Sequence, residues 1–521
     1  MLIATLGVPL VGAVLGALAA ESFTGKRLLS GLALLNLGAA ALLAVLVTFG
    51  KPDFVPGPWN LALAADRLGV LFALLAAGIQ ATVLPYAARC LDPRAFRRFA
   101  AVSQVLVAAT DLTGTAATLS TLVLGWVVVS VAVYALVAGT GAPPGAARRL
   151  GAAFLLGDGA LVGALVMIWR FAGDPSLFRL SEAEARLAAV RFVLGPAVLT
   201  AGDAVAVLVV ASAVVRSALW PGPRWLPSTL AAPTPVSALL HAGVVNAGGF
   251  LLIRLSPFFA ATPAASVLAL TAGLGTAALG GVASAVRSDV KGALVYSTMS
   301  QMGFMIAECA VGAFAAAAFH LVAHGMYKAS LFLGSGDGIS EHVHDRRSCA
   351  PPAPAPNRMR PVLACTGAFG LLALAGLLHP ALLAHRGGEV TVVFAAVTSG
   401  ALLWGWAERR QAFGQTPWAF LGVAVAGAAY LLWFSAVTGW LTPELPAVGA
   451  GFLSPFWLLG ALAAAGGLAA IVAYAGRWPR VAARLHARAL WAAWGMPPTR
   501  SAMSAAKQRR RLEVELWKQP I

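Results

Sequence analysis

Uncharged apolar runs of about 20 residues recur along most of the sequence, and each is long enough to cross a bilayer as an α-helix. Of the 521 residues, 59% are hydrophobic and only 11% are charged. Soluble domains carry roughly 25% charged residues. The runs do not alternate between apolar and polar residues, as the strands of a membrane β-barrel would. The sequence therefore predicts an all-α polytopic membrane protein and excludes a soluble domain.

We count about 15 such runs, which is the number of transmembrane helices that we expect. They lie at residues 2–20, 28–49, 65–86, 99–118, 119–139, 150–171, 196–217, 235–255, 263–285, 290–311, 312–334, 361–380, 389–407, 416–437 and 454–476. The first run has no basic segment before it and no clear cleavage site after it. We therefore expect it to be a retained span rather than a signal peptide.

Basic residues outnumber acidic ones by 37 to 20, which gives a net charge of +17. An excess of this size can indicate nucleic-acid binding, but here the basic residues punctuate the apolar runs. Most of them follow odd-numbered runs, as Arg94, Arg148 and Arg346 do. By the positive-inside rule, this distribution places the N-terminus outside and the C-terminus in the cytoplasm. We expect the protein to lie in the cell inner membrane. We expect the lipid membrane as a partner and no nucleic acid.

Residues 233–254 combine prolines at the start of an apolar run with a histidine, His241, inside it. Arg216 also lies in apolar sequence shortly before this stretch. The residues that we expect at helix breaks are Pro221, Pro223, Pro233, Pro235 and, further along, His379. Broken helices with charged groups at membrane depth accompany the movement of ions or protons. A single buried histidine can equally serve only as a hydrogen-bonding group between helices.

His320, His324 and Lys328 follow one another at intervals of four residues in a later run. On an α-helix this spacing places all three on one face, over about 12 Å. Two groups that titrate near neutrality and one ammonium in such a line predict a proton path. Desolvation favours the neutral form of a lysine, so Lys328 could load and release a proton. The histidine pair could instead bind a metal ion, but the helix has no carboxylate one turn away and no H-E-x-x-H motif.

Two further charged residues stand out within or beside apolar runs. Asp158 lies between glycines in the sixth run, and an unpaired carboxylate there would be costly. We expect it to pair with Arg216, because either charge alone at that depth is strongly unfavourable. Lys291 follows Asp289, which we expect to cap the N-terminus of the next helix.

No other motif indicates chemistry carried out by this chain. The four cysteines have neither paired spacing nor the arrangement of a zinc site. The sequence contains no P-loop, no glycine-rich dinucleotide motif after a strand and no nucleophile elbow. We therefore expect a transporter subunit and not an enzyme, with no metal or cofactor in this chain.

Three motifs resemble a known family. They are Pro-Thr-Pro-Val-Ser-Ala-Leu-Leu-His-Ala from residue 233, Asp-Val-Lys-x-x-Leu-Val-Tyr-Ser-Thr-Met-Ser-Gln-Met-Gly from residue 289, and Phe-His-Leu-x-x-His-x-x-Tyr-Lys-Ala-x-Leu-Phe-Leu-Gly-Ser-Gly from residue 319. From about residue 85 to residue 336 the chain looks like the antiporter-like subunits of respiratory complex I and of Mrp-type cation/proton antiporters. The resemblance implies two inverted five-helix repeats, each with a broken helix, and a proton path along the membrane midplane.

The same resemblance assigns roles to residues by motif. Arg216 falls where the family has a lysine on the first broken helix, and His241 matches the bridging histidine. The other positions that match family path residues are Asp158, Lys291, His320, His324 and Lys328. Two departures stand out. Val127 replaces the family's glutamate, and the lysine of the second broken helix is absent near residues 361–385, where His379 is the nearby candidate.

With these departures, the chain looks most like the inorganic-carbon branch of the family, the DabB subunits. Two further features point the same way: the Val-Asn-Ala-Gly-Gly-Phe-Leu string and the basic C-terminus. That likeness implies a proton- or cation-conducting (H+ or Na+) subunit that powers DabA, a large cytoplasmic zinc protein similar to β-carbonic anhydrases. Zinc is then expected on the partner. Three alternatives stay open: a subunit of a complex I-like NADH-quinone oxidoreductase, a subunit of an Mrp-type Na+/H+ antiporter, and a scaffold that has lost the path through Val127 and Arg216.

Together, these observations divide the chain into five parts. They are N-terminal transmembrane helices at 1–98, a first inverted repeat at 99–255, a second inverted repeat at 256–407 with a polar linker at 337–360, C-terminal transmembrane helices at 408–477, and a basic amphipathic cytoplasmic tail at 478–521. The tail is expected either to anchor the chain on anionic lipid or to dock a cytoplasmic partner.

Overall fold

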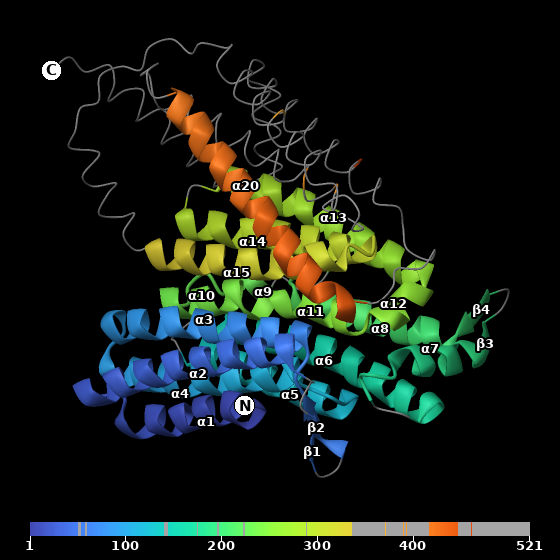
Figure 1. Cartoon of the computed structure of the whole chain (residues 1–521), viewed down its shortest axis with the longest axis horizontal. Helices are drawn as coiled ribbons and strands as arrows, with labels where there is room; N and C mark the ends of the chain where they lie inside the picture. The colour runs from blue at the N-terminus through green and yellow to red at the C-terminus, as the bar shows by residue number, and fades with distance from the viewer. Residues whose placement is uncertain are drawn as a thin grey trace.

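The computed structural model describes residues 1–335, with gaps at 51–53, 58–59, 140–143, 174–175, 195–196, 222–224 and 288, as well as residues 416–445 and a few isolated positions. Nearly all of these residues are helical (Figure 1). Several predictions lie outside the described ranges: the spans at 361–380, 389–407 and 454–476, the linker at 337–360, the tail at 478–521, Pro223 and His379.

Six long helices form the N-terminal part of the bundle. They are α1 (Leu2–Ala19), α2 (Phe23–Phe49), α3 (Arg67–Cys90), α4 (Pro93–Gly114), α5 (Leu119–Ala138) and α6 (Pro144–Ala172). They correspond in order to the first six predicted spans. Side-chain caps mark several starts: Asp66 accepts from the Gly69 N–H, and Asp92 accepts from the Arg94 and Ala95 N–H groups. A short hairpin, β1 (Phe54–Pro56) and β2 (Ala62–Ala64), joins α2 to α3.

The seventh predicted span, 196–217, is wrong at its start. An amphipathic helix, α7 (Leu180–Ala189), leads into a second hairpin, β3 (Arg191–Leu194) and β4 (Ala197–Thr200). Only then does α8 (Ala201–Arg216) begin. Thr200 and Asp203 form a reciprocal capping box, which fixes the helix start where the apolar residues alone gave no boundary.

The structure confirms a helix interruption after Arg216. Helix α8 ends there, and a short helix, α9 (Trp225–Ser228), follows. Pro233 and Pro235 turn out to start a helix, α10 (Thr234–Ala242), where proline is well tolerated because the first N–H groups need no helical partner. A second interruption was not predicted. Between α10 and α11 (Ala247–Arg254) lies a single 3-10 turn, η2 (Val244–Asn246).

The next helices are α12 (Ser256–Ala261), α13 (Pro263–Val286), α14 (Val290–Ala310) and α15 (Phe314–Gly334). Asp289 caps α14, as expected, by accepting from the Gly292 N–H at 2.7 Å. Helices α13 and α14 cross at small residues. A Cβ atom on Gly273 would lie 2.6 Å from the Gly303 carbonyl oxygen. Such close backbone contact is typical of helices that associate within a membrane.

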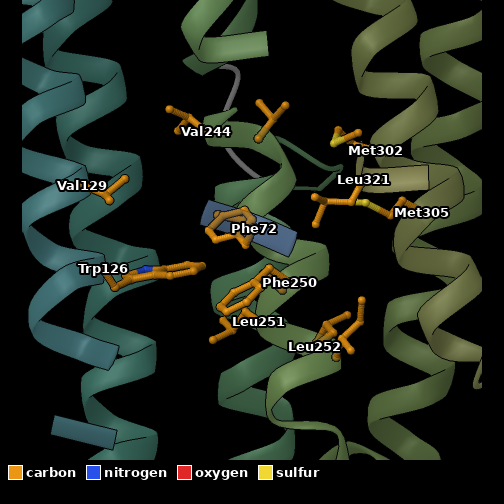
Figure 2. Close-up of a cluster of buried hydrophobic side chains, with 14 of the residues drawn as sticks. Phe72, Trp126, Val129, Val244, Phe250, Leu251, Leu252, Met302, Met305 and Leu321 are labelled. Carbon is orange, nitrogen blue, oxygen red and sulfur yellow. The ribbon is translucent and has the colours of Figure 1, made fainter. Parts of the chain in front are cut away.

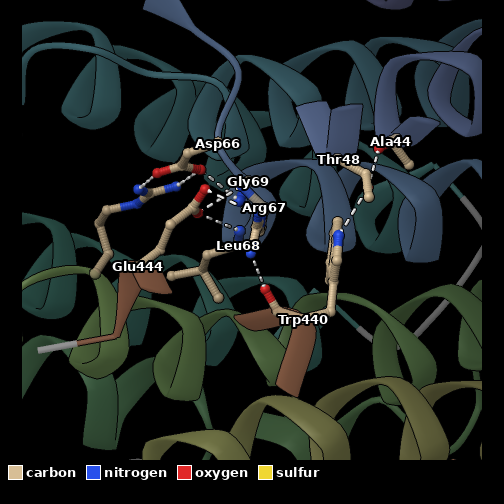
Figure 3. Close-up of polar contacts among 9 residues, drawn as sticks. Ala44, Thr48, Asp66, Arg67, Leu68, Gly69, Trp440 and Glu444 are labelled. Atoms are coloured by element: carbon tan, nitrogen blue, oxygen red, sulfur yellow. Dashed lines mark hydrogen bonds and ion pairs between the residues drawn. The ribbon is translucent and has the colours of Figure 1, made fainter. Parts of the chain in front are cut away.

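A late helix, α20 (Thr416–Leu441), runs diagonally across the bundle and packs on α15 (Figure 1). It is followed by η4 (Thr442–Glu444), which is tied to the N-terminal helices (Figure 3). The Glu444 carboxylate accepts from the Arg67 N–H at 2.6 Å, and Trp440 donates through Nε1 to the Thr48 hydroxyl at 2.8 Å. Beside them Arg254 at the end of α11 pairs with Asp66.

The core lies where α3, α5, α11, α14 and α15 meet. Phe72 stacks on Phe250 with ring centroids 4.4 Å apart, and Trp126 points toward this pair (Figure 2). Many large apolar side chains face outward instead, for example Leu155 and Trp169. Among the described residues, eight helices are long and apolar enough to cross a membrane. The full number of 15 stays a prediction.

Candidate functional site

The expected proton file lies on α15. His320, His324 and Lys328 occupy one face of this helix, and the two histidine rings have centroids 5.8 Å apart. His324 and Lys328 are buried, at 5% and 3% exposure. Charged or titratable groups at this depth are costly unless they find polar partners. The neighbouring helices supply such partners at both ends of the file.

At one end, Lys328 donates to the Ser297 hydroxyl on α14 at 2.5 Å. Lys291, at the start of α14, lies six residues from Ser297 and donates to the Ala232 carbonyl oxygen just before α10. Both contacts are to neutral oxygens. Among the described ion pairs, neither lysine has a carboxylate partner. A neutral acceptor leaves a lysine freer to lose its proton than a paired carboxylate would.

At the other end of the file lies Glu308, a residue that the sequence analysis did not single out. Its Oε2 is 2.9 Å from Nδ1 of His320, and its side chain is 5% exposed. Glu308 is near the end of α14, opposite the first turns of the antiparallel α15. The sequence did contain a signal, since a lone carboxylate interrupts Met-Ile-Ala-Glu-Cys-Ala. Only the helix pairing shows that it meets His320.

His241 lies on α10, against the same helix. Its ring stacks on Phe332 of α15 with centroids 4.4 Å apart. It is 1% exposed and within electrostatic range of Lys328 and Lys291. Within the described part of the chain, His241 Nδ1 and His324 Nε2 have no hydrogen-bond partner from the protein. Buried ring nitrogens without protein partners on facing helices suit a water-mediated relay.

The interruption between α10 and α11 brings this region close to α15. Asn246 donates from Nδ2 to Ala242 O at 2.6 Å and to Leu321 O at 3.3 Å, so it joins the turn to α15. Gly325 faces the break, because a Cβ atom there would lie 2.7 Å from Ala242 O. The family resemblance predicted the position of His241 in the path. It did not predict the 3-10 turn that follows this helix, which begins after Gly243 and is held by Asn246.

The predicted pair of Asp158 and Arg216 is confirmed. Nη2 of Arg216 lies 2.9 Å from Asp158 Oδ1, with side-chain exposures of 2% and 13%. The same nitrogen donates to Ser130 Oγ at 2.6 Å. The guanidinium also lies over the rings of Trp126 and Phe154, at 4.4 and 4.3 Å from their centroids. Arg216 is therefore enclosed as a fixed cation.

Between this pair and α10 lies an apolar cavity. Its lining comes mainly from α3, α4, α5 and the α10–α11 region, and includes Trp126, Val129 and Gly243. The two hydroxyls in the lining, Thr110 and Thr113, donate to carbonyls of their own helix at 2.8 Å. Among the described residues that line the cavity, none has a titratable side chain that could connect Arg216 to His241.

One more buried carboxylate lies apart from both groups. Asp111 on α4 is 1% exposed and accepts from the Asn36 amide of α2 at 3.4 Å. Metal binding finds no support in the described residues, where no three His, Cys, Asp or Glu side chains come together in the geometry of a metal site.

Comparison with known proteins places these features in a family. A family model described as "NADH:quinone oxidoreductase/Mrp antiporter, TM" matches residues 116–407. The chain belongs to this family of antiporter-like membrane subunits, and it is a multi-pass membrane protein. The predicted fold class, all-α with the antiporter-like arrangement, is thereby confirmed.

Individual relatives narrow the likeness. The "Probable inorganic carbon transporter subunit DabB1" of Halothiobacillus neapolitanus is 37% identical over 293 residues, which cover 54% of this chain and 51% of that protein. A DabB of the same description from Bacillus subtilis is 34% identical over 296 residues, 56% of each chain. Chain 5 of a Picosynechococcus NAD(P)H-quinone oxidoreductase is 40% identical over 179 residues, which cover 33% of this chain and 27% of that protein. The matches with the DabB proteins thus span about half of their length.

Solved structures share the fold. The Mrp complex from Dietzia has a TM-score of 0.56 and 25% identity, covering 94% of this chain and 52% of that one. An archaeal membrane-bound sulfane sulfur reductase has a TM-score of 0.62 at 18% identity, and the match covers 87% of this chain and 100% of that one. The second match shows the fold alone.

Proposed function

We propose that this chain is the proton- or cation-conducting membrane subunit of an energy-coupled uptake complex for inorganic carbon, CO2 or bicarbonate. In this proposal, ion movement through the chain powers a zinc-bearing, carbonic-anhydrase-like partner on the cytoplasmic side. The protein lies in the cell inner membrane with its N-terminus outside and its C-terminus in the cytoplasm. Zinc belongs to the partner, and this chain carries no cofactor.

The observation that carries the proposal is the line of buried and half-buried titratable groups on α14 and α15. Lys291, His320, His324 and Lys328 are contributed by these two helices, and His241 joins the line from α10. Several groups that exchange protons, held at membrane depth without compensating charges along most of the line, are expensive unless they conduct. The likeness to proteins named inorganic carbon transporter subunits supports inorganic carbon as the transported substrate of the complex.

Asp158 and Arg216 take a different role in this proposal. Arginine does not release its proton under ordinary conditions. The pair therefore supplies a fixed dipole beside the interrupted helix α8, and protons move through the histidine and lysine groups of the second repeat.

The second candidate is a subunit of a complex I-like NADH-quinone oxidoreductase or of an Mrp-type Na+/H+ antiporter. It is favoured by the 40% identity to the NAD(P)H-quinone oxidoreductase chain and by the structural match to the Mrp complex. The two candidates differ in their partners. A large zinc-ligand-bearing protein encoded next to this chain selects the first, and quinone and iron–sulfur subunits select the second.

The experiment is expression of the chain with its zinc-bearing neighbour in a bacterial host that lacks carbonic anhydrase. We expect growth in air and accumulation of radiolabelled bicarbonate, both lost when an uncoupler collapses the ion gradient. Na+ efflux or NADH–quinone activity without bicarbonate accumulation would instead establish the second candidate. Comparing a protonophore with a sodium ionophore identifies the coupling ion.

A further inference from the structure

Glu308 forms a contact that differs in kind from the buried Asp158–Arg216 pair. Its carboxylate meets a histidine, 2.9 Å away, whereas Asp158 meets an arginine. A carboxyl–imidazole pair can hold one proton on either partner, but a carboxylate–guanidinium pair cannot exchange one. A buried ion pair is also weak grounds for stability, because its desolvation offsets the attraction. The Glu308–His320 contact therefore points to proton exchange.

The position of Glu308 places it at the end of the file. It lies two residues before the end of α14, so it is about 3 Å from that end along the helix axis. Lys291 lies 17 residues earlier, about 26 Å away by the rise of 1.5 Å per residue. The hydrocarbon core of a bilayer is about 30 Å thick. Glu308 and Lys291 thus lie near opposite ends of α14, a helix that the sequence predicts to span the membrane.

The surroundings of Glu308 leave His320 as its proton-exchanging neighbour in the file. Phe304 of α14 lies against the His320 ring, with centroids 5.8 Å apart. The preceding residue, Phe319, packs edge-on against Tyr430 and Phe434 of α20, and Tyr430 is within electrostatic range of Glu308. Of the groups in the file, His320 is the one in direct contact with the Glu308 carboxylate, so it is the group to which Glu308 can pass a proton.

We propose that Glu308, together with His320, is the terminal proton-binding site of the α14–α15 file, at the membrane face where α14 ends and α15 begins. This inference rests on the proposed proton-conducting function. The Glu308 carboxyl gives its proton to Nδ1 of His320 and becomes a carboxylate. The imidazolium then releases a proton from Nε2 toward His324. Before the next transfer, His320 returns to its Nε2–H tautomer by proton exchange or ring rotation, and Glu308 takes up another proton from its membrane face. In the orientation proposed above, that face is external.

The test uses the complete complex reconstituted in vesicles, with proton flux followed by an enclosed pH-sensitive dye. Glu308→Gln keeps the size of the side chain and can still bond to His320, but it cannot carry a proton. We expect its flux to fall at least tenfold. Azide or formate, small weak acids that can replace a missing proton carrier, should then restore much of the flux, after subtraction of the leak in protein-free vesicles. A merely structural role would give no such rescue.

Asp111→Asn is the matched control, because it also converts a buried carboxylate to an amide but lies on α4, away from the file. It should keep at least half of the wild-type flux. Wild-type flux in Glu308→Gln, or a loss that weak acids do not restore, overturns the proposal. If Glu308→Gln does not assemble, Glu308→Ala replaces it, because alanine also cannot carry a proton, and a flux that is either normal or not restored by weak acids is again the contrary result.

This readout separates the inference from the proposed function. A wild-type complex that conducts protons without accumulating bicarbonate would remove the inorganic-carbon proposal and leave the Glu308 test intact. A wild-type complex that moves Na+ and no protons would overturn the role of Glu308.

Discussion

Arg216 and Lys328 carry the same formal charge, but their surroundings suit different tasks. Arg216 has a carboxylate, a hydroxyl and two aromatic faces around its guanidinium. Lys328 has one hydroxyl acceptor, Ser297. The first arrangement holds a permanent charge in place, and the second stabilises the ammonium without preventing its deprotonation. Two predictions at the scale of single residues follow from this difference.

The first prediction concerns the pair of Asp158 and Arg216. Asp158→Asn should lower stability by about 3–5 kcal/mol, because it leaves a buried guanidinium without its carboxylate. The effect should appear as a lower yield and a lower thermal midpoint of the purified complex. Adding Arg216→Gln should recover part of the loss, since no charge is then buried alone. A double variant no better than the worse single variant would show that the pair is not coupled.

The second prediction concerns Lys328. Lys328→Ala should abolish energy-dependent bicarbonate accumulation in carbon-limited cells while the complex still assembles. Lys328→Arg should fail as well, because arginine keeps the charge but does not exchange its proton. Full uptake by Lys328→Arg would mean that the position needs only a charge. That result would favour the alternative in which the chain is a scaffold without a proton path. Assembly is checked by copurification in every case.

At the scale of elements, the α10–α11 break and α15 form one unit. Gly325 lets the backbone of α15 approach Ala242, and Asn246 bonds across this contact to Leu321. His241 is held on the same stretch, against Phe332. The close approach of the two backbones therefore sets the distance between the bridging histidine and the file.

Gly325→Ala tests this arrangement. The added Cβ would lie 2.7 Å from Ala242 O and 2.9 Å from a Leu75 methyl carbon, so α15 must shift away. We expect a loss of about 1–3 kcal/mol in stability, typical of overpacking, and reduced uptake. Gly334→Ala on the same helix is the control, because no described atom lies within 4 Å of its Cβ position. Similar thermal midpoints and uptake for the two variants would contradict a special role for the contact.

Helices could be predicted from the sequence where a single local pattern, such as an apolar run or a regular residue spacing, defines them. Apolar runs of bilayer length gave α1 to α6, and the four-residue spacing placed His320, His324 and Lys328 on one face. The β3–β4 hairpin was missed because residues 192–199 are apolar and merge with the following helix in the sequence. Only the Thr200–Asp203 capping box separates them.

The site was predictable to a smaller extent, because pairing between helices is not a local signal. The Asp158–Arg216 pair could be predicted, since two opposite charges at membrane depth must meet. Glu308 was not singled out, because a carboxylate at the end of an apolar run also suits a loop boundary. Its partner depends on the register of α14 against α15, which no local pattern specifies.

At the scale of the whole molecule, the distribution of charge divides the bundle into two ends. Successive long helices run in opposite directions, so the end of α3 and the starts of α4, α6 and α14 lie together. Basic residues gather there: Arg89, Arg94, Arg97, Arg98, Arg148, Arg149 and Arg287. The opposite end holds balanced groups, with Asp66 and Glu444 close to Arg254 and Arg67. This asymmetry agrees with the proposed orientation, in which the end with the excess of positive charge faces the cytoplasm.

The last prediction is that a larger cytoplasmic partner docks on this basic end, helped by the basic residues that follow Arg477. Positive charge beyond what orientation requires attracts an acidic partner surface and speeds association. Deleting residues 481–521 should therefore weaken copurification of the zinc-bearing partner, and the loss should grow at higher salt because screening removes the remaining attraction. The control replaces the basic residues within 481–521 by glutamine at unchanged length, and it should weaken copurification similarly if charge is the cause. A deletion variant that retains its partner at both salt concentrations would refute the docking role and favour a lipid anchor for this segment.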